Sequence, residues 1–413
     1  MQTTKMISYL DLDINQYNLA DPVLHSTENV HLIWQAMRQK APVHWTQVEE
    51  KLGFWSVTKY QDVKTVLSNH RLFTSERGTL LNLLGKDDPA GGKQVTVTDP
   101  PKHAKLRRPM QKGFSDKALH RHVDIIQKEV KNLLEPMIDG QSIDFAQGMF
   151  ALSTAVAGAI LGLPSEDWPR ITQLTAMSIA PDDPKYQLSE GTEATLKSAH
   201  REIFSYFEEL IMEKEHWEED EVIGILLNQT IDGEPLDFGA VLSNCYTLLL
   251  GATVTTPHVP STSIYKLIQQ GNFEEWSKHP EYLETGIEES LRWSSPASHI
   301  MRYAIEDTQI RGQHIKKGDA IVSWIPSANR DEEIFDNPFE FDFRRKPNPH
   351  ISFGSGAHYC IGHSAARQTL NILFSELFKS FKGFELCGEV EYLSSNFIGG
   401  IKHMPLKGLV KSK

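Results

Sequence analysis

The feature that most constrains the fold of this chain is a glycine-rich stretch around a cysteine at position 360. Residues 349–367 read PHISFGSGAHYCIGHSAAR, and the order F-G-x-G-x-H-x-C-x-G is formed by Phe353, Gly354, Gly356, His358, Cys360 and Gly362. Three glycines so close to one cysteine predict a backbone that turns tightly and can lie against a flat group. The backbone N–H groups of such a turn can point at the sulfur, where hydrogen bonds tune a metal thiolate.

The residues after Cys360 predict that the sulfur lies near the start of a helix. The run SAARQTLNILFSELF has apolar residues at helical spacing, and a helix stabilises negative charge at its N-terminus. A cysteine in a glycine-rich turn is often only a small buried residue, but the combined spacing favours a thiolate that binds haem iron axially. In these residues the stretch resembles the cysteine loop of the cytochromes P450, of the soluble bacterial kind.

The length and patterning of the chain predict one mainly helical domain. The 413 residues contain no Gly/Ser- or Pro-rich linker and no internal repeat, so we expect a single domain over 1–413. The expected fold class is predominantly α with small β-sheets (α+β). The resemblance implies the cytochrome P450 fold, with haem between a long distal helix and the helix of the cysteine loop. Helical spacing occurs over 27–40, 116–138, 144–161, 168–179, 192–215 and 237–270.

The cysteines and apolar segments predict a soluble protein of a reducing compartment. Cys245, Cys360 and Cys387 are too few and too scattered for a disulfide framework. The N-terminus lacks the charged start and apolar run of a signal peptide. The apolar segment 149–164 is shorter than the roughly 20 residues of a membrane span. We therefore expect a cytoplasmic protein with no membrane partner.

The charge of the chain argues against nucleic acid as a partner. The net charge is −12, whereas nonspecific nucleic-acid binding needs clustered cations. Basic residues are nevertheless dense over 102–112 and 344–346. Each cluster is either a solvated surface or a docking face for an acidic electron carrier, which complementary charge would favour.

The segment 237–270 is the longest predicted helix, and it contains an unusual residue at position 254. It is either a buried core helix or, by the resemblance, the distal helix that faces bound oxygen. The resemblance implies that Gly251 and Ala252 leave room for dioxygen and that Thr255 is the catalytic alcohol. The family has an acid where this chain has Val254, and valine can neither donate a proton nor organise water. Protons would then reach Thr255 through another water chain or through a polar group of the substrate.

Two prolines interrupt the same segment. Pro257 and Pro260 each remove a backbone N–H, at a cost of about 3 kcal/mol inside a helix. Either the helix kinks, or it stops and restarts with Thr256 as cap and Pro257 at the first position. We expect the kink, because freed carbonyl oxygens could anchor the water that Val254 cannot.

The resemblance implies further haem and substrate residues. His103 and Arg107 are four apart and share one helix face, as a solvated pair or as ligands of a haem carboxylate. Arg302 and His358 match the other residues that hold the haem propionates. The residues expected at the substrate are Val254, Ala297, Ser298, His299, Phe397 and Ile398. For His299, a satisfied polar residue at the pocket edge is favoured over a catalytic one.

A charged pair in GIEESLRWSSP is expected to be structural. Glu289 and Arg292 are three apart on one helix face, and an exposed pair of this kind would add little stability. The resemblance implies a buried pair behind the haem, joined by an arginine from a later segment. Arg344 is the residue that we expect in that third position.

The function implied by the resemblance is monooxygenation of a small organic substrate, with tailoring of a secondary metabolite as the expected role. It requires haem b, O2 and electrons from NAD(P)H, delivered by a separate ferredoxin and ferredoxin reductase. One alternative is an atypical oxidase of the same scaffold that couples, cyclises or desaturates. Another is a haem sensor without turnover, which the presence of Thr255 disfavours. A peroxide-driven enzyme is disfavoured because the Arg-Pro pair of that subgroup is absent around Thr255.

Overall fold

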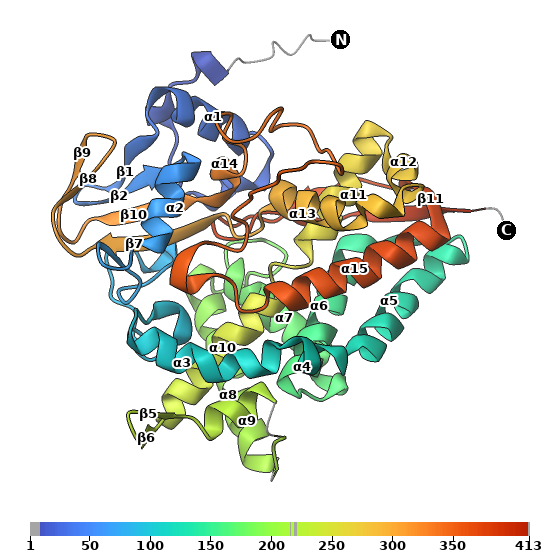
Figure 1. The fold of residues 1–413 in the computed structure, drawn as a ribbon, viewed down its shortest axis with the longest axis horizontal. Helices are drawn as coiled ribbons and strands as arrows, with labels where there is room; N and C mark the ends of the chain where they lie inside the picture. The colour runs from blue at the N-terminus through green and yellow to red at the C-terminus, as the bar shows by residue number, and fades with distance from the viewer. Residues whose placement is uncertain (1–8, 215, 219–220, 412–413) are drawn as a thin grey trace.

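Helices outweigh strands in the computed structural model, which describes residues 9–214, 216–218 and 221–411 (Figure 1). The α-helices of these residues are α1 (Val30–Lys40), α2 (Tyr60–Ser68), α3 (Lys102–Met110), α4 (Asp116–His120), α5 (Val123–Ile138), α6 (Phe145–Leu161), α7 (Trp168–Ile179), α8 (Thr192–Glu213), α9 (Val222–Leu227), α10 (Phe238–Thr253), α11 (His258–Gln270), α12 (Phe273–Ser277), α13 (Leu283–Ser294), α14 (Ile325–Ala328) and α15 (His363–Ser380). The strands are β1 (Val43–Glu49), β2 (Leu52–Val57), β3 (Phe73–Thr74), β4 (Ser142–Asp144), β5 (Thr230–Ile231), β6 (Glu234–Pro235), β7 (His299–Ala304), β8 (Thr308–Ile310), β9 (Gln313–Ile315), β10 (Ala320–Trp324), β11 (Phe381–Leu386), β12 (Glu391–Tyr392), β13 (Ile401–His403) and β14 (Pro405–Val410).

The helical core positions both sides of the expected site. α6 begins after Asp144, whose Oδ1 accepts a hydrogen bond from Gln147 N at 3.2 Å, and it ends at Gly162, which has a left-handed φ of 74°. Its apolar side chains are nearly all buried against α5, α7, α10 and α11. α5 also packs against α15, the helix that follows Cys360. The predicted fold class, mainly helical with small sheets, is confirmed.

The main sheet carries one of the expected haem ligands. Its strand order is β1-β2-β10-β7-β3, and β10 runs parallel to β2 whereas the other pairs are antiparallel. On β7, Met301 and Tyr303 pack into the cluster of Trp34 and Trp324. Arg302 lies between them in the sequence and therefore faces the opposite side of the sheet.

The expected kink in segment 237–270 is wrong, because the helix stops and restarts. α10 ends at Thr253, the residues 254–257 are not helical, and α11 begins at His258 with Pro257 as its N-cap. Pro257 has no N–H to donate to Thr253, so the bond that would continue the helix cannot form. Pro260 then lies in the first turn of α11, where a missing N–H breaks no helical bond.

The segment 237–270 is apolar and lies partly buried in the helical core. By length and composition, Phe238–Gln270 is long enough to cross a membrane, but half of its most apolar window is buried inside the protein. Its side chains pack against α6, α7 and α8, which the amphipathic patterns of those helices require.

Candidate active site

The cysteine loop has the tight turns that its glycines predict. Gly354 and Gly356 have φ values of 74° and 76°, a region that side chains disfavour. A Cβ on Gly356 would also lie 2.7 Å from the Cα of Ser68. The turn is closed by a hydrogen bond from Cys360 N to the carbonyl oxygen of Phe353 at 2.9 Å. Glycine at position 356 therefore permits the close packing of this loop against α2.

The Cys360 thiol is free and lies just before the N-terminus of α15. Burial raises the pKa of this thiol, while a hydrogen bond from the backbone of Gly362 and the charges of Arg107 and Arg367 lower it. These three groups stabilise the thiolate form, and a metal-bound sulfur needs that form. The prediction that backbone N–H groups point at the sulfur agrees with the contact from Gly362.

Arg302 is a buried cation without an ion-pair partner among the described residues. Arg302 is only 3% exposed, and its Nη1 donates to the carbonyl oxygen of Met301 at 2.9 Å. Burial lowers the pKa of Arg302 to about 10, partly offset by the charge of Asp99. A buried guanidinium of this kind requires an anion. The carboxylates of haem would meet that requirement, so this residue fits the group.

Two histidines lie close to each other near the cysteine loop. The ring centroids of His103 on α3 and His358 are 4.2 Å apart. Nε2 of His103 is buried without a hydrogen-bond partner in the described part of the chain. Burial, together with the charges of His358 and Arg107, lowers the pKa of His103 to about 4. A neutral ring with a free nitrogen can donate to a carboxylate oxygen, which again fits haem.

Asp99 and Tyr359 orient these groups, and the sequence did not single them out. Asp99 Oδ1 lies 3.7 Å from His358 Nε2 and accepts from Ser75 Oγ at 2.7 Å. Arg107 donates from Nη2 to the carbonyl oxygen of Tyr359, which joins α3 to the cysteine loop. Only the proline-rich start of α3, DPPKH, was a sequence signal for Asp99.

The end of α10 has an open face and free polar atoms. Gly251 is exposed, and a Cβ there would meet no atom within 4 Å. Thr255 Oγ1 donates to the carbonyl oxygen of Gly251 at 3.0 Å. Across the described residues, no hydrogen bond reaches the carbonyl oxygens of Ala252 and Thr253. The helix break therefore leaves two acceptors beside Thr255 that can bind water.

Val254 lies in an apolar cluster rather than beside the polar atoms. It is 2% exposed and packs with Ile179 and Ile398, and with the partly buried Phe397. Ala297 forms an isolated bridge with Ile398, so these expected substrate residues come together. The cluster joins α7, the end of α10 and the segment before β13.

His299 and Ser298 do not take the positions expected for substrate contacts. His299 Nδ1 bonds the carbonyl oxygen of Asn396 at 2.9 Å, and Leu81 N donates to its Nε2 at 3.0 Å. Burial lowers the pKa of His299 to about 4, and no ring nitrogen is left for a substrate. The favoured interpretation, a satisfied polar residue, therefore agrees with the structure. Ser298, which precedes β7, lines a different cavity.

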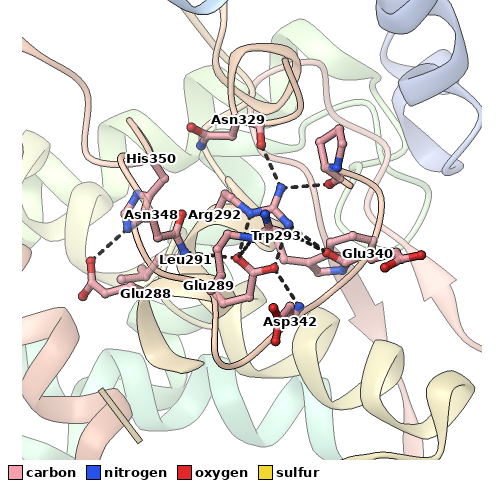
Figure 2. A network of polar contacts seen from close by, with 12 residues as sticks. Glu288, Glu289, Leu291, Arg292, Trp293, Asn329, Glu340, Asp342, Asn348 and His350 are labelled. Carbon is pink, nitrogen blue, oxygen red and sulfur yellow. Dashed lines mark hydrogen bonds and ion pairs between the residues drawn. The ribbon is translucent and has the colours of Figure 1, made fainter. Parts of the chain in front are cut away.

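Behind the cysteine loop, Glu289 and Arg292 form a buried ion pair, shown in Figure 2. Both side chains are 0% exposed, and the two N–O distances are 2.7 Å. The remaining nitrogen of Arg292 donates to the carbonyl oxygens of Asn329 and Pro338, at 2.8 and 2.9 Å. Such satisfaction of every polar atom is what a buried pair requires.

The third member of this network is Arg345, and the expectation of Arg344 is wrong. Arg345 Nε lies 3.1 Å from Glu289 Oε2. Arg344 instead bonds Glu275 on the surface at 2.6 Å and lies over the Phe343 ring. The two side chains diverge because the chain turns here, with a hydrogen bond from Arg345 N to the carbonyl oxygen of Asp342.

Two further connections hold the cysteine loop, and the sequence analysis missed both. Asn329 donates to Ser295 and Ser352 at 2.7 and 2.9 Å and accepts from Ile351 N at 2.8 Å. Glu288 accepts from Arg367 on α15, and it also accepts from His350, a contact drawn in Figure 2. The adjacent acid of the EES sequence was the one available signal for Glu288.

Comparison with known proteins gives one consistent family. Residues 274–397 match the family described as Cytochrome P450. The chain is 34% identical to cytochrome P450 NovI of Streptomyces niveus, over 98% of this chain and 99% of that protein. It is 30% identical to linalool 8-monooxygenase of Pseudomonas putida, over 94% and 97%. The solved structure of P450 OxyD, described as involved in the biosynthesis of vancomycin-type antibiotics, superposes with a TM-score of 0.83 at 29% identity, covering 96% of this chain and all of that one.

Proposed function

This chain belongs to the cytochrome P450 family and is a haem-thiolate monooxygenase, and from that premise we propose that it tailors a secondary metabolite as one domain in the cytoplasm. The observation that carries the proposed role is the near full-length likeness to OxyD, which is described as involved in antibiotic biosynthesis. The apolar residue at position 254 also supports a specialised substrate, since the site itself lacks the acid found in the family.

Residues from both ends of the chain would hold the haem. Cys360 is the axial ligand in this proposal, and His103, Arg107, Arg302 and His358 bind the propionates through charge-assisted hydrogen bonds. Support comes from the buried, unpaired Arg302 and from the free Nε2 of His103. Haem b supplies the activation of O2 with electrons from redox partners.

Thr255 would hold and pass a proton at Oγ1. Its hydroxyl hydrogen is engaged by the carbonyl oxygen of Gly251, which leaves the oxygen lone pairs able to accept from water. The free carbonyl oxygens of Ala252 and Thr253 would position that water. This route replaces the carboxylate that Val254 cannot provide.

The apolar cluster around Val254 would face the carbon skeleton of the substrate. Ile398, Phe397 and Ala297 contribute from the segments around β7 and β13. Gly251 and Ala252 would leave space beside the haem.

The exposed face of α3 would dock a ferredoxin, which a ferredoxin reductase supplies with electrons from NAD(P)H. Lys102, Lys105 and Arg108 are exposed and recur at three-residue spacing on this helix. The same helix carries Arg107, which bonds the cysteine loop. A positive face so close to the thiolate favours an acidic electron carrier.

The test is a difference spectrum of the haem-loaded protein against peptides, polyketides and terpenoids, followed by turnover with a surrogate ferredoxin system in 18O2. We expect a Soret shift with one of these classes and one labelled oxygen in its product. A product without label would instead indicate the coupling, cyclising or desaturating oxidase. No NADPH oxidation with any binder would indicate the sensor. The Cys360→Ser variant is the matched control, and it should lose the long-wavelength absorbance of the reduced carbon monoxide complex.

A further inference from the structure

A cavity lies away from the cysteine loop, between α1, α11, the end of α13 and the residues Tyr392, Gly399 and Gly400. We call it the α1–α11 cavity. Its volume is about 360 Å³, within the roughly 300–1,000 Å³ of small-molecule sites. Of the residues expected at haem or substrate, Ser298 alone lines it. The proposed monooxygenase function leaves this cavity unexplained.

Several residues that line this cavity carry buried polar atoms without a partner among the described residues. Nη1 of Arg330, Nε1 of Trp34, Nδ1 of His31 and Oγ of Ser294 are all buried, have no hydrogen-bond partner among the described residues and belong to lining residues. Arg330 and Trp34 are only 3% and 2% exposed. Each unsatisfied buried polar atom is costly, so several around one space indicate that something polar fills it.

The charge at the cavity is positive in its interior. Arg330 forms no ion pair within the described residues, and its Nη2 donates to the carbonyl oxygen of Trp293 at 2.7 Å. The neighbouring cations Arg38 and Arg292 are already paired, with Glu332 and Glu289. Burial, and the charges of Arg292 and Arg38, lower the pKa of Arg330 to about 9, partly offset by the charges of Glu28 and Glu289. A bound anion would remove this unfavourable field.

The remaining charged and titratable groups of the lining compensate the charge of Arg330 only in part. Lys266 on α11 lines the cavity, and its Nζ lies 5.0 Å from the centroid of the Trp293 ring. Burial and the adjacent Arg330 hold the pKa of His31 well below its usual value, so this ring is neutral. Glu28 is the acid of the lining, and it lies on the exposed rim, where its Oε1 accepts from Tyr392 at 2.9 Å. The lining therefore holds the buried cation Arg330 and the partly exposed Lys266 against one exposed acid, Glu28.

Flat aromatic surfaces form much of the wall. The guanidinium carbon of Arg330 lies 4.6 Å from the centroid of the Trp293 ring, and Nζ of Lys266 lies 5.0 Å from the same centroid. Trp34, Tyr265, Tyr392 and Phe339 line other sides. Aromatic walls favour another planar ring, through offset or edge-to-face contacts. Aromatic walls stabilise an inorganic anion only weakly, and such an anion would leave most of the cavity volume unfilled.

We propose that the α1–α11 cavity binds a small aromatic carboxylate, with the carboxylate at Arg330 and Lys266 and the ring between the aromatic side chains. Arginine recognises a carboxylate in a bidentate geometry, for which the unpartnered Nη1 is available. Ser294 Oγ and Trp34 Nε1 supply additional donors. The site is separate from the haem and from the substrate cluster.

The test uses isothermal titration of the haem-loaded protein with sodium benzoate and sodium 2-naphthoate. Saturating imidazole blocks the distal face of the haem in a parallel series. We expect one site per chain in both series, whereas sodium acetate and benzyl alcohol, which lack the ring or the charge, bind at least about tenfold more weakly. No heat from either aromatic acid would show that the cavity holds water only. Loss of binding with imidazole would place the acid at the haem, and either result overturns the proposal.

Variants at the cavity give an independent measurement. Arg330→Met removes the buried cation and should weaken naphthoate binding at least about tenfold. Lys266→Met changes a partly exposed residue, so it retains the fold and should weaken binding about threefold to tenfold. Lys379→Met, on the surface of α15, is the matched control and should leave binding unchanged. Unchanged binding in a folded Lys266→Met protein together with unchanged binding in Arg330→Met would refute the assignment.

Discussion

Arg367 on α15 bonds both carboxylate oxygens of Glu288 on α13, from Nε to Oε1 at 2.6 Å and from Nη2 to Oε2 at 2.9 Å. His350, on the segment that leads into the cysteine loop, approaches the same carboxylate at 3.0 Å. One acid therefore joins α13, the cysteine-loop segment and α15. α15, the helix that follows Cys360, is therefore joined to α13 through the negative charge of Glu288, which protonation at low pH removes.

Acid should weaken this junction. Burial alone would raise the pKa of Glu288, but hydrogen bonds from Arg367 and His350 lower it from 4.5 to about 2. A lowered pKa stabilises the folded state above pH 4.5, and that stabilisation is lost as the pH falls toward 2. Glu288→Gln should cost about 2 kcal/mol at neutral pH, allowing for partial solvent exposure, and less at low pH. Urea unfolding between about pH 6 and 3.5 measures the difference.

The matched control for this acid is Glu202→Gln, which removes an exposed carboxylate paired with Arg170 on the surface. Its effect should be small and nearly independent of pH. A stability difference between Glu288→Gln and the parent that grows as the pH falls would contradict the assigned pKa.

Arg345 and Arg344 provide a matched pair of adjacent variants. Arg345→Met removes a cation from the fully buried Glu289 and should cost about 3 kcal/mol. Arg344→Met breaks only an exposed pair with Glu275 and should leave the free energy of unfolding nearly unchanged. Thermal unfolding of both variants checks the order. Equal destabilisation would mean that Arg345 does not support Glu289.

Thr255→Ala should uncouple reductant use from product formation. Without Oγ1, the proposed proton route is interrupted, and product formed per NADPH should fall at least about tenfold. Thr255→Ser retains the hydroxyl and is the control. Coupling in the alanine variant equal to that of the parent would exclude Thr255 from proton delivery.

In the same assay, Val254→Asp should not improve coupling. The side chain at 254 is buried among Ile179 and Ile398, so an aspartate there lacks a polar partner. We expect a loss of about 2 kcal/mol in stability. Val254→Asp that couples better than the parent, without loss of stability, would show that the acid can reach the proton route.

The basic face of α3 should govern the interaction with the electron donor. Arg108→Glu should raise the KM for an acidic ferredoxin by about tenfold at low salt, with little change in substrate affinity. The difference should shrink as ionic strength rises, because exposed charges are screened. Lys197→Glu, an exposed residue of α8, is the control. Equal effects of the two variants would remove α3 as the docking face.

Local patterns predicted most helices because apolar spacing and caps decide them. The predicted helix 168–179 coincides with α7, and 144–161 differs from α6 by one residue. The tight turns of the cysteine loop could also be predicted from its glycines. Gly354 and Gly356 lie where the backbone is left-handed, and at Gly356 it is also closely packed.

Features that depend on a single turn or on distant segments were not readable. Arg344 and Arg345 are neighbours in sequence, and only the turn after Asp342 decides which one faces Glu289. Two prolines close together predict an interruption of the helix, but the spacing does not decide between a kink and a stop. The kink that we expected is therefore a stop in the structure. Arg330 and Trp34 are nearly 300 residues apart, and no spacing could reveal that they share a cavity.

The interruption at 254–257 divides the segment 237–270 into two separate helices, α10 and α11. A continuous rod would transmit any tilt of one end to the other. α10 packs against α8 and α9, whereas α11 packs against α13. Under the proposed function, a wall built from two separate helices would let a bulky substrate displace α10 without tilting α11 and the scaffold behind it.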